Sequence, residues 1–244
     1  MSNNLHFGSN FEFEKIMRTK YFIVAGVAAV SGAVVTNSCM AVATSSIGLT
    51  IIKNILLGGI SKGMATLKDK EAFMNSTLID QAIPSQLKSI NNTLQSLGMS
   101  SIVQKEKQYI ADAAYFTANI SEPILNNAVN SLTADDVTRI AQGGSGMATQ
   151  ILKEKTQSQL IAAITPKVDA KLNEVGFVNT LNNALKGSSI LGSLFGNQSQ
   201  NLASNGISQL ASEQIVNGLF NVIGNYEQQN ADKINQAFGT QIIK

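Results

Sequence analysis

Residues 51–67 read IIKNILLGGISKGMATL, and this stretch decides the fold class. Its large apolar residues recur at intervals of three and four, the spacing that places side chains on one face of an α-helix. They are Ile51, Ile52, Ile55, Leu56, Ile60, Met64 and Leu67. A half-buried strand would instead place an apolar residue at every second position. We therefore predict a first helix over 47–67.

The same spacing continues along the chain and predicts further helices, separated by recognisable caps. Gly98 is expected to end the helix at 87–97, and Ser121 with Pro123 to open one at 124–132. Thr133 and Asp136 form a capping-box pattern. The other predicted helices cover 102–116, 134–141, 146–176 with an interruption at Pro166, 177–185 and 210–238.

The composition favours helix throughout. The chain has 3 Pro and no Trp, and 44% of its residues are apolar while 14% are charged. Short connections between the predicted helices favour antiparallel neighbours in a bundle. We predict an all-α fold with a single multi-helix bundle domain over 44–244. Its longest loop is expected at 186–206, where Gly, Ser, Asn and Gln replace the helical pattern.

Charge and side-chain chemistry exclude several functions. With 18 Lys and Arg against 16 Asp and Glu, the formal charge is only +2. Such a chain has no basic surface for a phosphate backbone, so we expect no nucleic-acid partner. The single Cys and single His leave neither a zinc site nor a His-dependent triad, and we predict no metal and no cofactor.

An export segment lies near the N-terminus. Residues 17–20 include the basic Arg18 and Lys20, and residues 21–35 read YFIVAGVAAVSGAVV without a charge. This order is typical of a signal peptide, and fifteen helical residues fall short of a bilayer's hydrocarbon core. We assign 17–43 as the signal peptide. Residues 1–16 are interpreted as a spurious or disordered extension, with Met17 as an alternative start to Met1.

Two cleavage sites compete after the apolar run, and an uncleaved anchor stays as a third alternative. Cys39 follows Ser38 in a loose lipobox, and we favour lipidation at this Cys. The pattern Ala41-Val42-Ala43 would instead release a protein that begins at Thr44. The prediction is an exported protein of the periplasm, outer membrane or cell surface, attached to a membrane by a lipid anchor.

The order of several stretches resembles DUF4197, a bacterial exported family of unknown function. The matching stretches are 54–67 (NILLGGISKGMATL), 83–97, 124–146, 156–176 and 213–227. The resemblance implies an all-helical fold and export, and it implies no activity or catalytic residue. The chain departs from the family pattern at Ser145, around Ala113 and at 230–233.

Few residues suggest chemistry. Gly143, Gly144, Ser145 and Gly146 precede a helix and could present backbone N–H groups to an anion, although a simple helix break is favoured. Glu122, Glu213 and Glu227 are interpreted as acids on solvated faces, and Tyr109, Tyr115, Phe116, Phe220 and Tyr226 as core residues. We predict a non-catalytic protein that binds a protein partner or an apolar small molecule. The alternative is a periplasmic hydrolase that uses paired carboxylates.

Overall fold

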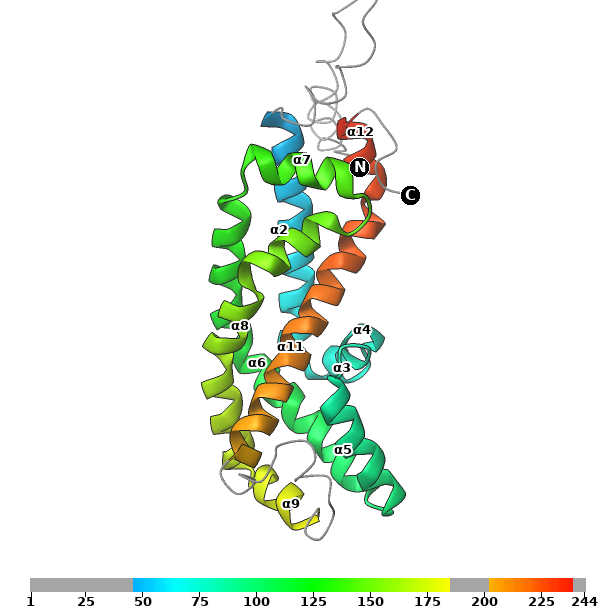
Figure 1. Ribbon diagram of the computed structural model, residues 1–244, viewed down its shortest axis with the longest axis vertical. Coiled ribbons are helices and arrows are strands. Elements are labelled where there is room, and N and C mark those ends of the chain that lie inside the picture. The colour runs from blue at the N-terminus through cyan, green and yellow to red at the C-terminus, as the bar shows by residue number, and fades with distance from the viewer. Residues whose placement is uncertain (1–45, 185–201, 239–244) are drawn as a thin grey trace, which may run out of the picture. The chain divides into compact units, whose positions relative to one another are not determined.

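A computed structural model describes residues 46–184 and 202–238, all within one unit, 37–244 (Figure 1). Every regular element in these ranges is a helix and none is a strand, so the all-α prediction is confirmed. The helices are α2 (Ser46–Lys68), α3 (Lys70–Met74), α4 (Thr77–Asp80), α5 (Ser85–Ser96), α6 (Ser100–Asn130), α7 (Ala134–Gly143), α8 (Met147–Glu174), α9 (Phe177–Ala184), α11 (Leu202–Gln229) and α12 (Ala231–Phe238).

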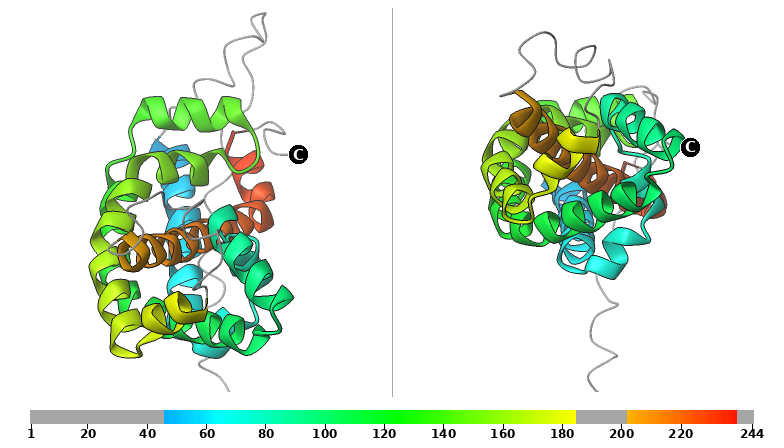
Figure 2. Two further views of the ribbon diagram at one scale, coloured as in Figure 1. Left: turned by 60° about the horizontal axis from the view of Figure 1, so that its bottom comes forward. Right: turned by 90° about the horizontal axis from the view of Figure 1, so that it is seen from below.

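Four long helices form the centre of the domain. Each of α2, α6, α8 and α11 packs mainly on two of the others, in the closed order α2, α6, α8, α11 and back to α2. Consecutive long helices alternate in direction, and α7 lies across the end of the bundle where α2 begins (Figures 1 and 2). The predicted antiparallel bundle is therefore present, with its core made of aliphatic side chains from all four helices.

The contact between α2 and α11 depends on glycines from the stretch that predicts the fold. A Cβ added at Gly59 would lie 3.2 Å from Ile223 Cα, and one at Gly63 would lie 2.3 Å from Leu219 Cδ1. Only the absence of a side chain lets the backbones of the two helices come this close. The glycines of 51–67 are thus packing positions rather than helix breaks.

Two predicted helix boundaries are wrong, because Pro123, expected in the first turn of a helix, and Pro166, expected to interrupt one, lie inside α6 and α8. Both prolines are exposed, and so are Asn119 and Ala162, the residues four positions earlier whose carbonyls lose a backbone partner. Water can satisfy a carbonyl on that side while the opposite side of the helix stays packed. The Ser121 hydroxyl accordingly donates to the Thr117 carbonyl within α6 instead of capping a new helix.

The predicted last helix divides at Asn230 into α11 and α12. The Asn230 side-chain amide donates to the Tyr226 carbonyl at 2.8 Å, and its backbone carbonyl accepts from Lys233 N at 3.1 Å. Asparagine competes in this way with the helical hydrogen bonds. Residues 202–206, expected at the end of the long loop, begin α11. The rest of that loop lies outside the described residues.

Other caps follow the prediction, and two short helices add to it. Thr133 and Asp136 form the predicted capping box at the start of α7, and Gly98 follows α5 with φ of 75°. Helices α3 and α4, which the helical spacing did not predict, are capped by Asp69 and Ser76. No helix in the described ranges is long and apolar enough to cross a membrane.

Candidate functional site

The glycine turn predicted to bind an anion lies between α7 and α8. Gly144 and Gly146 have φ of 76° and 82°, and Gly146, rather than the predicted Ser145, is the N-cap of α8. A glycine has no side chain with which to accept hydrogen bonds from the first free N–H groups of a helix. The cap therefore has to come from elsewhere in the chain.

Glu227 of α11 supplies that cap. Its carboxylate accepts from Ala148 N at 3.2 Å, Thr149 N at 2.8 Å and the Thr149 hydroxyl at 2.6 Å. A negative charge at a helix N-terminus is favourable because the N–H dipoles point toward it. Glu227 is completely buried, so its interpretation as a solvated acid is wrong. An anion from outside would have to compete with Glu227 for these N–H groups, and such binding stays a prediction.

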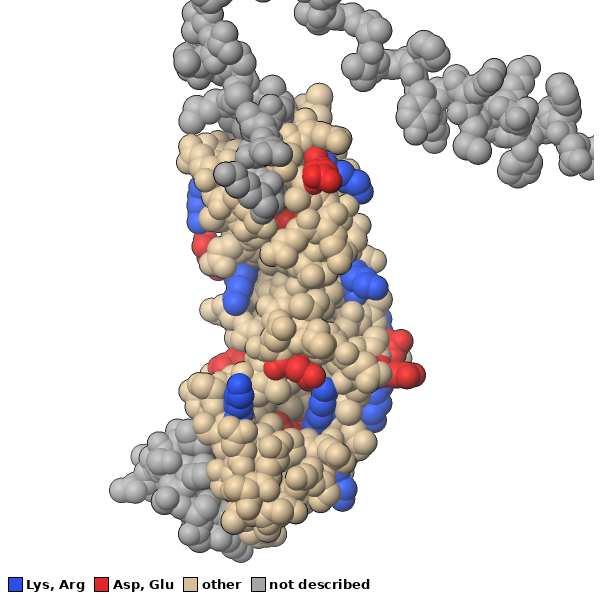
Figure 3. Space-filling view, turned by 90° about the vertical axis from the view of Figure 1, so that its right-hand side faces the viewer, with Lys and Arg blue, Asp and Glu red and all other residues tan. Residues whose placement is uncertain are grey.

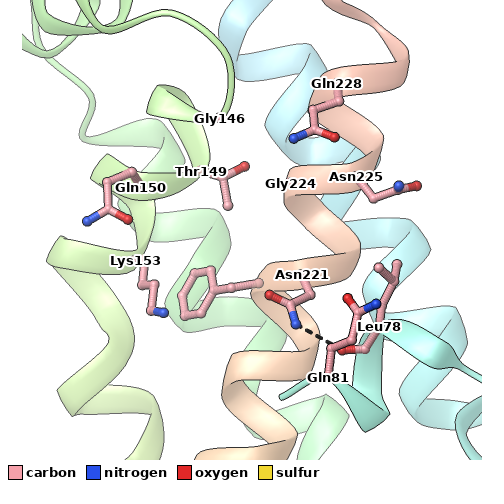
Figure 4. Close-up of a pocket in the computed structure, with 11 residues that line it drawn as sticks. Leu78, Gln81, Gly146, Thr149, Gln150, Lys153, Asn221, Gly224, Asn225 and Gln228 are labelled. Atoms are coloured by element: carbon pink, nitrogen blue, oxygen red, sulfur yellow. Dashed lines mark hydrogen bonds between the residues drawn. The ribbon is translucent and has the colours of Figure 1, made fainter.

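An open groove of about 360 Å³ lies beside this cap (Figure 4). Amide side chains dominate its lining, and Lys153 is its one charged residue. The Asn221 amide donates to the Leu78 carbonyl at 2.9 Å, which links α11 to α4. The amides are Gln81, Gln150, Asn221, Asn225 and Gln228. Because the groove is open to water, its polar groups need no ligand to satisfy them.

A second cavity, of about 350 Å³, contains a buried carboxyl group. Glu106 of α6 is 3% exposed, and Gln214 of α11 is 2% exposed. Asn91 of α5 donates its side-chain amide to Glu106 Oε1 at 3.3 Å. Aliphatic and thioether side chains form the apolar part of the lining (Met74, Ile83, Val103 and Ile110), and Gln104, Lys107 and Gln108 add further polar groups. We refer to this site as the Glu106 cavity.

Three buried oxygen atoms of the Glu106 cavity have no hydrogen-bond partner among the residues that the structure describes. They are Asn91 Oδ1, Glu106 Oε2 and Gln214 Oε1, one from each of three helices. With Glu106 ionised, each is a hydrogen-bond acceptor, and leaving such a group buried without a donor costs about 1–3 kcal/mol. Proteins satisfy nearly all buried polar atoms, so three in one cavity require an explanation.

The Glu106 carboxyl is also electrostatically unusual. Burial raises its pKa from the ordinary 4.5 to about 8, while the hydrogen bond from Asn91 acts in the opposite direction. The neighbouring Lys107 does not neutralise it, because the Lys107 ammonium lies 2.6 Å from Asp80 Oδ1. A strongly shifted carboxyl in a cavity is a recognised mark of a functional site.

The chemistry open to this cavity is limited by its single acid. Of the described residues, Glu106 is the only one that brings a carboxyl group to the lining, so these residues do not form the paired carboxylates of a glycosidase there. Across the described residues no group of three or more His, Cys, Asp or Glu side chains could hold a metal ion. The cavity is suited to accepting hydrogen bonds from a bound molecule.

Comparison with known proteins assigns the family. The model of the family described as "Protein of unknown function (DUF4197)" matches residues 44–243. The chain belongs to the DUF4197 family. No curated protein and no solved structure shows a significant match. The Glu106 cavity and the Glu227 cap both fall within the DUF4197 match.

None of the departures from the DUF4197 pattern, at Ser145, around Ala113 and at 230–233, is among the residues that line the Glu106 cavity. Ala113 and Ala114 are buried, but Tyr115 and Phe116 are 53% and 42% exposed, so their assignment to the core is wrong. The Phe116 ring lies 5.4 Å from Lys167 Nζ, at the surface between α6 and α8. On the face shown in Figure 3, charges of both signs are scattered among uncharged residues.

Sequence reasoning missed Glu106, although a signal was present. Val103 and Ile110 lie three residues before and four residues after Glu106, which places the acid on the apolar face of α6. An acid within such a stripe has to be buried with the stripe. Asn91 and Gln214 carried no comparable signal, because amides are common on solvated helix surfaces. Cys39, the predicted lipidation site, lies outside the described residues.

Proposed function

We propose that this DUF4197 protein is a non-catalytic binding protein of the bacterial cell envelope and that it holds a small molecule in the Glu106 cavity. The observation that carries the proposal is the set of three buried, unpartnered acceptor oxygens around one cavity. A molecule that supplies donors to them would remove an unfavourable contribution to the stability of the empty protein.

The cavity walls favour a ligand with an apolar body. Met74, Ile83, Val103 and Ile110 line the cavity together with polar residues, among them Asn91, Glu106 and Gln214. Small-molecule sites usually combine apolar walls with a few converging polar groups. We therefore expect a ligand with an apolar body and one polar group, and we expect that polar group to face Glu106.

The envelope location rests on the sequence. The apolar run at 21–35 follows basic residues, and Cys39 comes soon after that run. Two or more acyl chains on a terminal Cys would hold the protein on a membrane stably, since each buried methylene contributes about 0.8 kcal/mol. The bundle begins at Ser46, a short distance along the chain from Cys39.

Binding is tested by thermal unfolding of the full-length protein, extracted from membranes in detergent, against a panel of small molecules. We expect some members to raise the melting temperature of the wild type and to lose this effect with Val103→Phe, which fills the cavity. Ile102→Phe is the matched control, since Ile102 is a half-buried neighbour that does not line the cavity. Ligand effects that Val103→Phe leaves intact would contradict the proposal.

Location is tested by the intact mass of the membrane-extracted protein. We expect acyl mass on Cys39 as the first residue, and its loss in Cys39→Ala. A mature N-terminus at Thr44 without acyl mass would refute lipidation and would leave binding in the Glu106 cavity untouched.

A further inference from the structure

We propose that the Glu106 cavity recognises the protonated amino group of a small organic cation, an alkyl or aryl amine. This inference rests on the proposed small-molecule binding and names the chemical class of the ligand. Its basis is the number, type and position of the acceptor groups that the protein leaves unsatisfied.

The acceptors match an ammonium group in number. A primary ammonium carries three N–H donors and no acceptor. Once Glu106 is ionised, the cavity offers three unpartnered acceptors, Glu106 Oε2, Asn91 Oδ1 and Gln214 Oε1. The Asn91 amide nitrogen already donates to Glu106 Oε1, which leaves the Asn91 oxygen available for another donor. An alcohol supplies a single donor and would leave two of the three oxygens unsatisfied.

The charges also match. Within 46–184 and 202–238, Glu106 and Lys107 are the only charged residues that line the cavity, while α5 and α11 contribute the neutral Asn91 and Gln214. Because Lys107 is paired with Asp80 of α4, Glu106 has no cationic partner of its own. A hydrogen bond between an ammonium and a carboxylate is roughly twice as strong as one between neutral groups. A monocation therefore satisfies the site.

A divalent metal fits less well. Calcium takes about six to eight oxygen ligands, and magnesium needs a nearly ideal octahedron. The lining supplies one carboxyl group, four amides (Asn91, Gln104, Gln108 and Gln214) and the Lys107 ammonium, and its other residues are apolar. Those apolar side chains suit the hydrocarbon part of an amine, which a bare ion lacks.

Binding of an amine should release a proton near neutral pH. The free Glu106 carboxyl has a pKa of about 8 and is mostly protonated below that value. The bound cation favours the carboxylate, so the proton leaves to solvent as the ammonium enters. Affinity should consequently rise as pH increases toward 8, by up to about tenfold per pH unit.

The test uses full-length protein in detergent and measures binding calorimetrically with hexylammonium and, as its neutral counterpart, hexanol. We expect hexylammonium to bind and hexanol to bind at least about tenfold more weakly, because it lacks the charge and two of the donors. Glu106→Gln should weaken hexylammonium binding about 30-fold or more, as expected when one partner of a buried charge pair is removed. Glu213→Gln, a change on α11 outside the cavity, is the control.

The following results interpret the outcome. Circular dichroism checks that Glu106→Gln stays folded, and Gln214→Leu, which removes another acceptor, should also weaken hexylammonium more than hexanol. Equal binding of the two probes, unchanged by Glu106→Gln, would overturn the amine proposal while small-molecule binding stands. Failure of both probes, together with a panel ligand that Val103→Phe abolishes, would likewise refute only the amine. Failure of every small molecule would refute the proposed function itself.

Discussion

Replacing Glu227 with glutamine should destabilise the bundle, because this buried side chain caps a helix from a distance of 78 residues along the chain. Glutamine keeps the size of glutamate but exchanges one acceptor oxygen for an NH2 group and removes the charge. Thr149 donates twice to Oε2 and Ala148 N donates to Oε1, so one of the two sets of bonds must be lost.

The expected loss is about 2 to 4 kcal/mol of unfolding free energy. One hydrogen bond to a charged group contributes about 1.5–3 kcal/mol, and a negative charge at a helix N-terminus adds about 0.3–2 kcal/mol. Urea unfolding followed by far-ultraviolet circular dichroism measures the change. Glu213→Gln on the same helix is the control and should change stability by less than about 0.5 kcal/mol.

A double-mutant cycle with Thr149→Val isolates the interaction. We expect a coupling of about 1 kcal/mol or more, since the Thr149 hydroxyl lies 2.6 Å from Glu227 Oε2. If Glu227→Gln were as mild as Glu213→Gln, or if the two changes were simply additive, the assignment of Glu227 as the cap of α8 would be wrong.

Three further predictions concern the stability of the folded protein. The pKa of Glu106 is raised to about 8, so the folded state binds more protons than the unfolded state between about pH 4.5 and 8. Wild-type stability relative to Glu106→Gln should therefore fall by roughly 1 kcal/mol per pH unit across that window in urea titrations, and a rise would contradict the burial of this carboxyl. Gly59→Ala should lower the free energy of unfolding by about 1–3 kcal/mol because the new Cβ would lie 3.1 Å from Ile223. Gly224→Ala, whose Cβ would have its nearest neighbour at 3.6 Å, should instead raise the free energy of unfolding by about 0.5–1 kcal/mol. Thr133→Ala should cost about 1 kcal/mol through loss of the α7 capping box, and an unchanged urea midpoint would argue against that cap.

The helices were predictable because their periodic pattern is local. Residues 51–67 form most of α2, with the predicted apolar face largely buried. The errors at Pro123 and Pro166 have one cause. A proline marks a helix boundary only where packing against the rest of the protein does not stabilise the helix on both sides of it. Burial on the opposite side of α6 and α8 outweighs the missing hydrogen bond, and a local proline signal does not include this gain because it comes from packing on helices distant in the chain.

The polar sites were less predictable because they join distant parts of the chain. Glu227 caps α8 only after α11 has packed against it, and the Glu106 cavity needs α5, α6 and α11 together. The apolar stripe around Glu106 could have indicated its burial. No local pattern could have indicated that the amides of Asn91 and Gln214 would face it.

The most direct test of the Glu106 cavity as an amine site is the carboxyl carbon resonance of Glu106 during titration with hexylammonium near pH 7, assigned with Glu106→Gln. With a pKa of about 8, the free carboxyl should start mostly in its protonated position and move to the carboxylate position as the amine binds. A resonance that stays in place while hexylammonium saturates the protein would contradict the proposal.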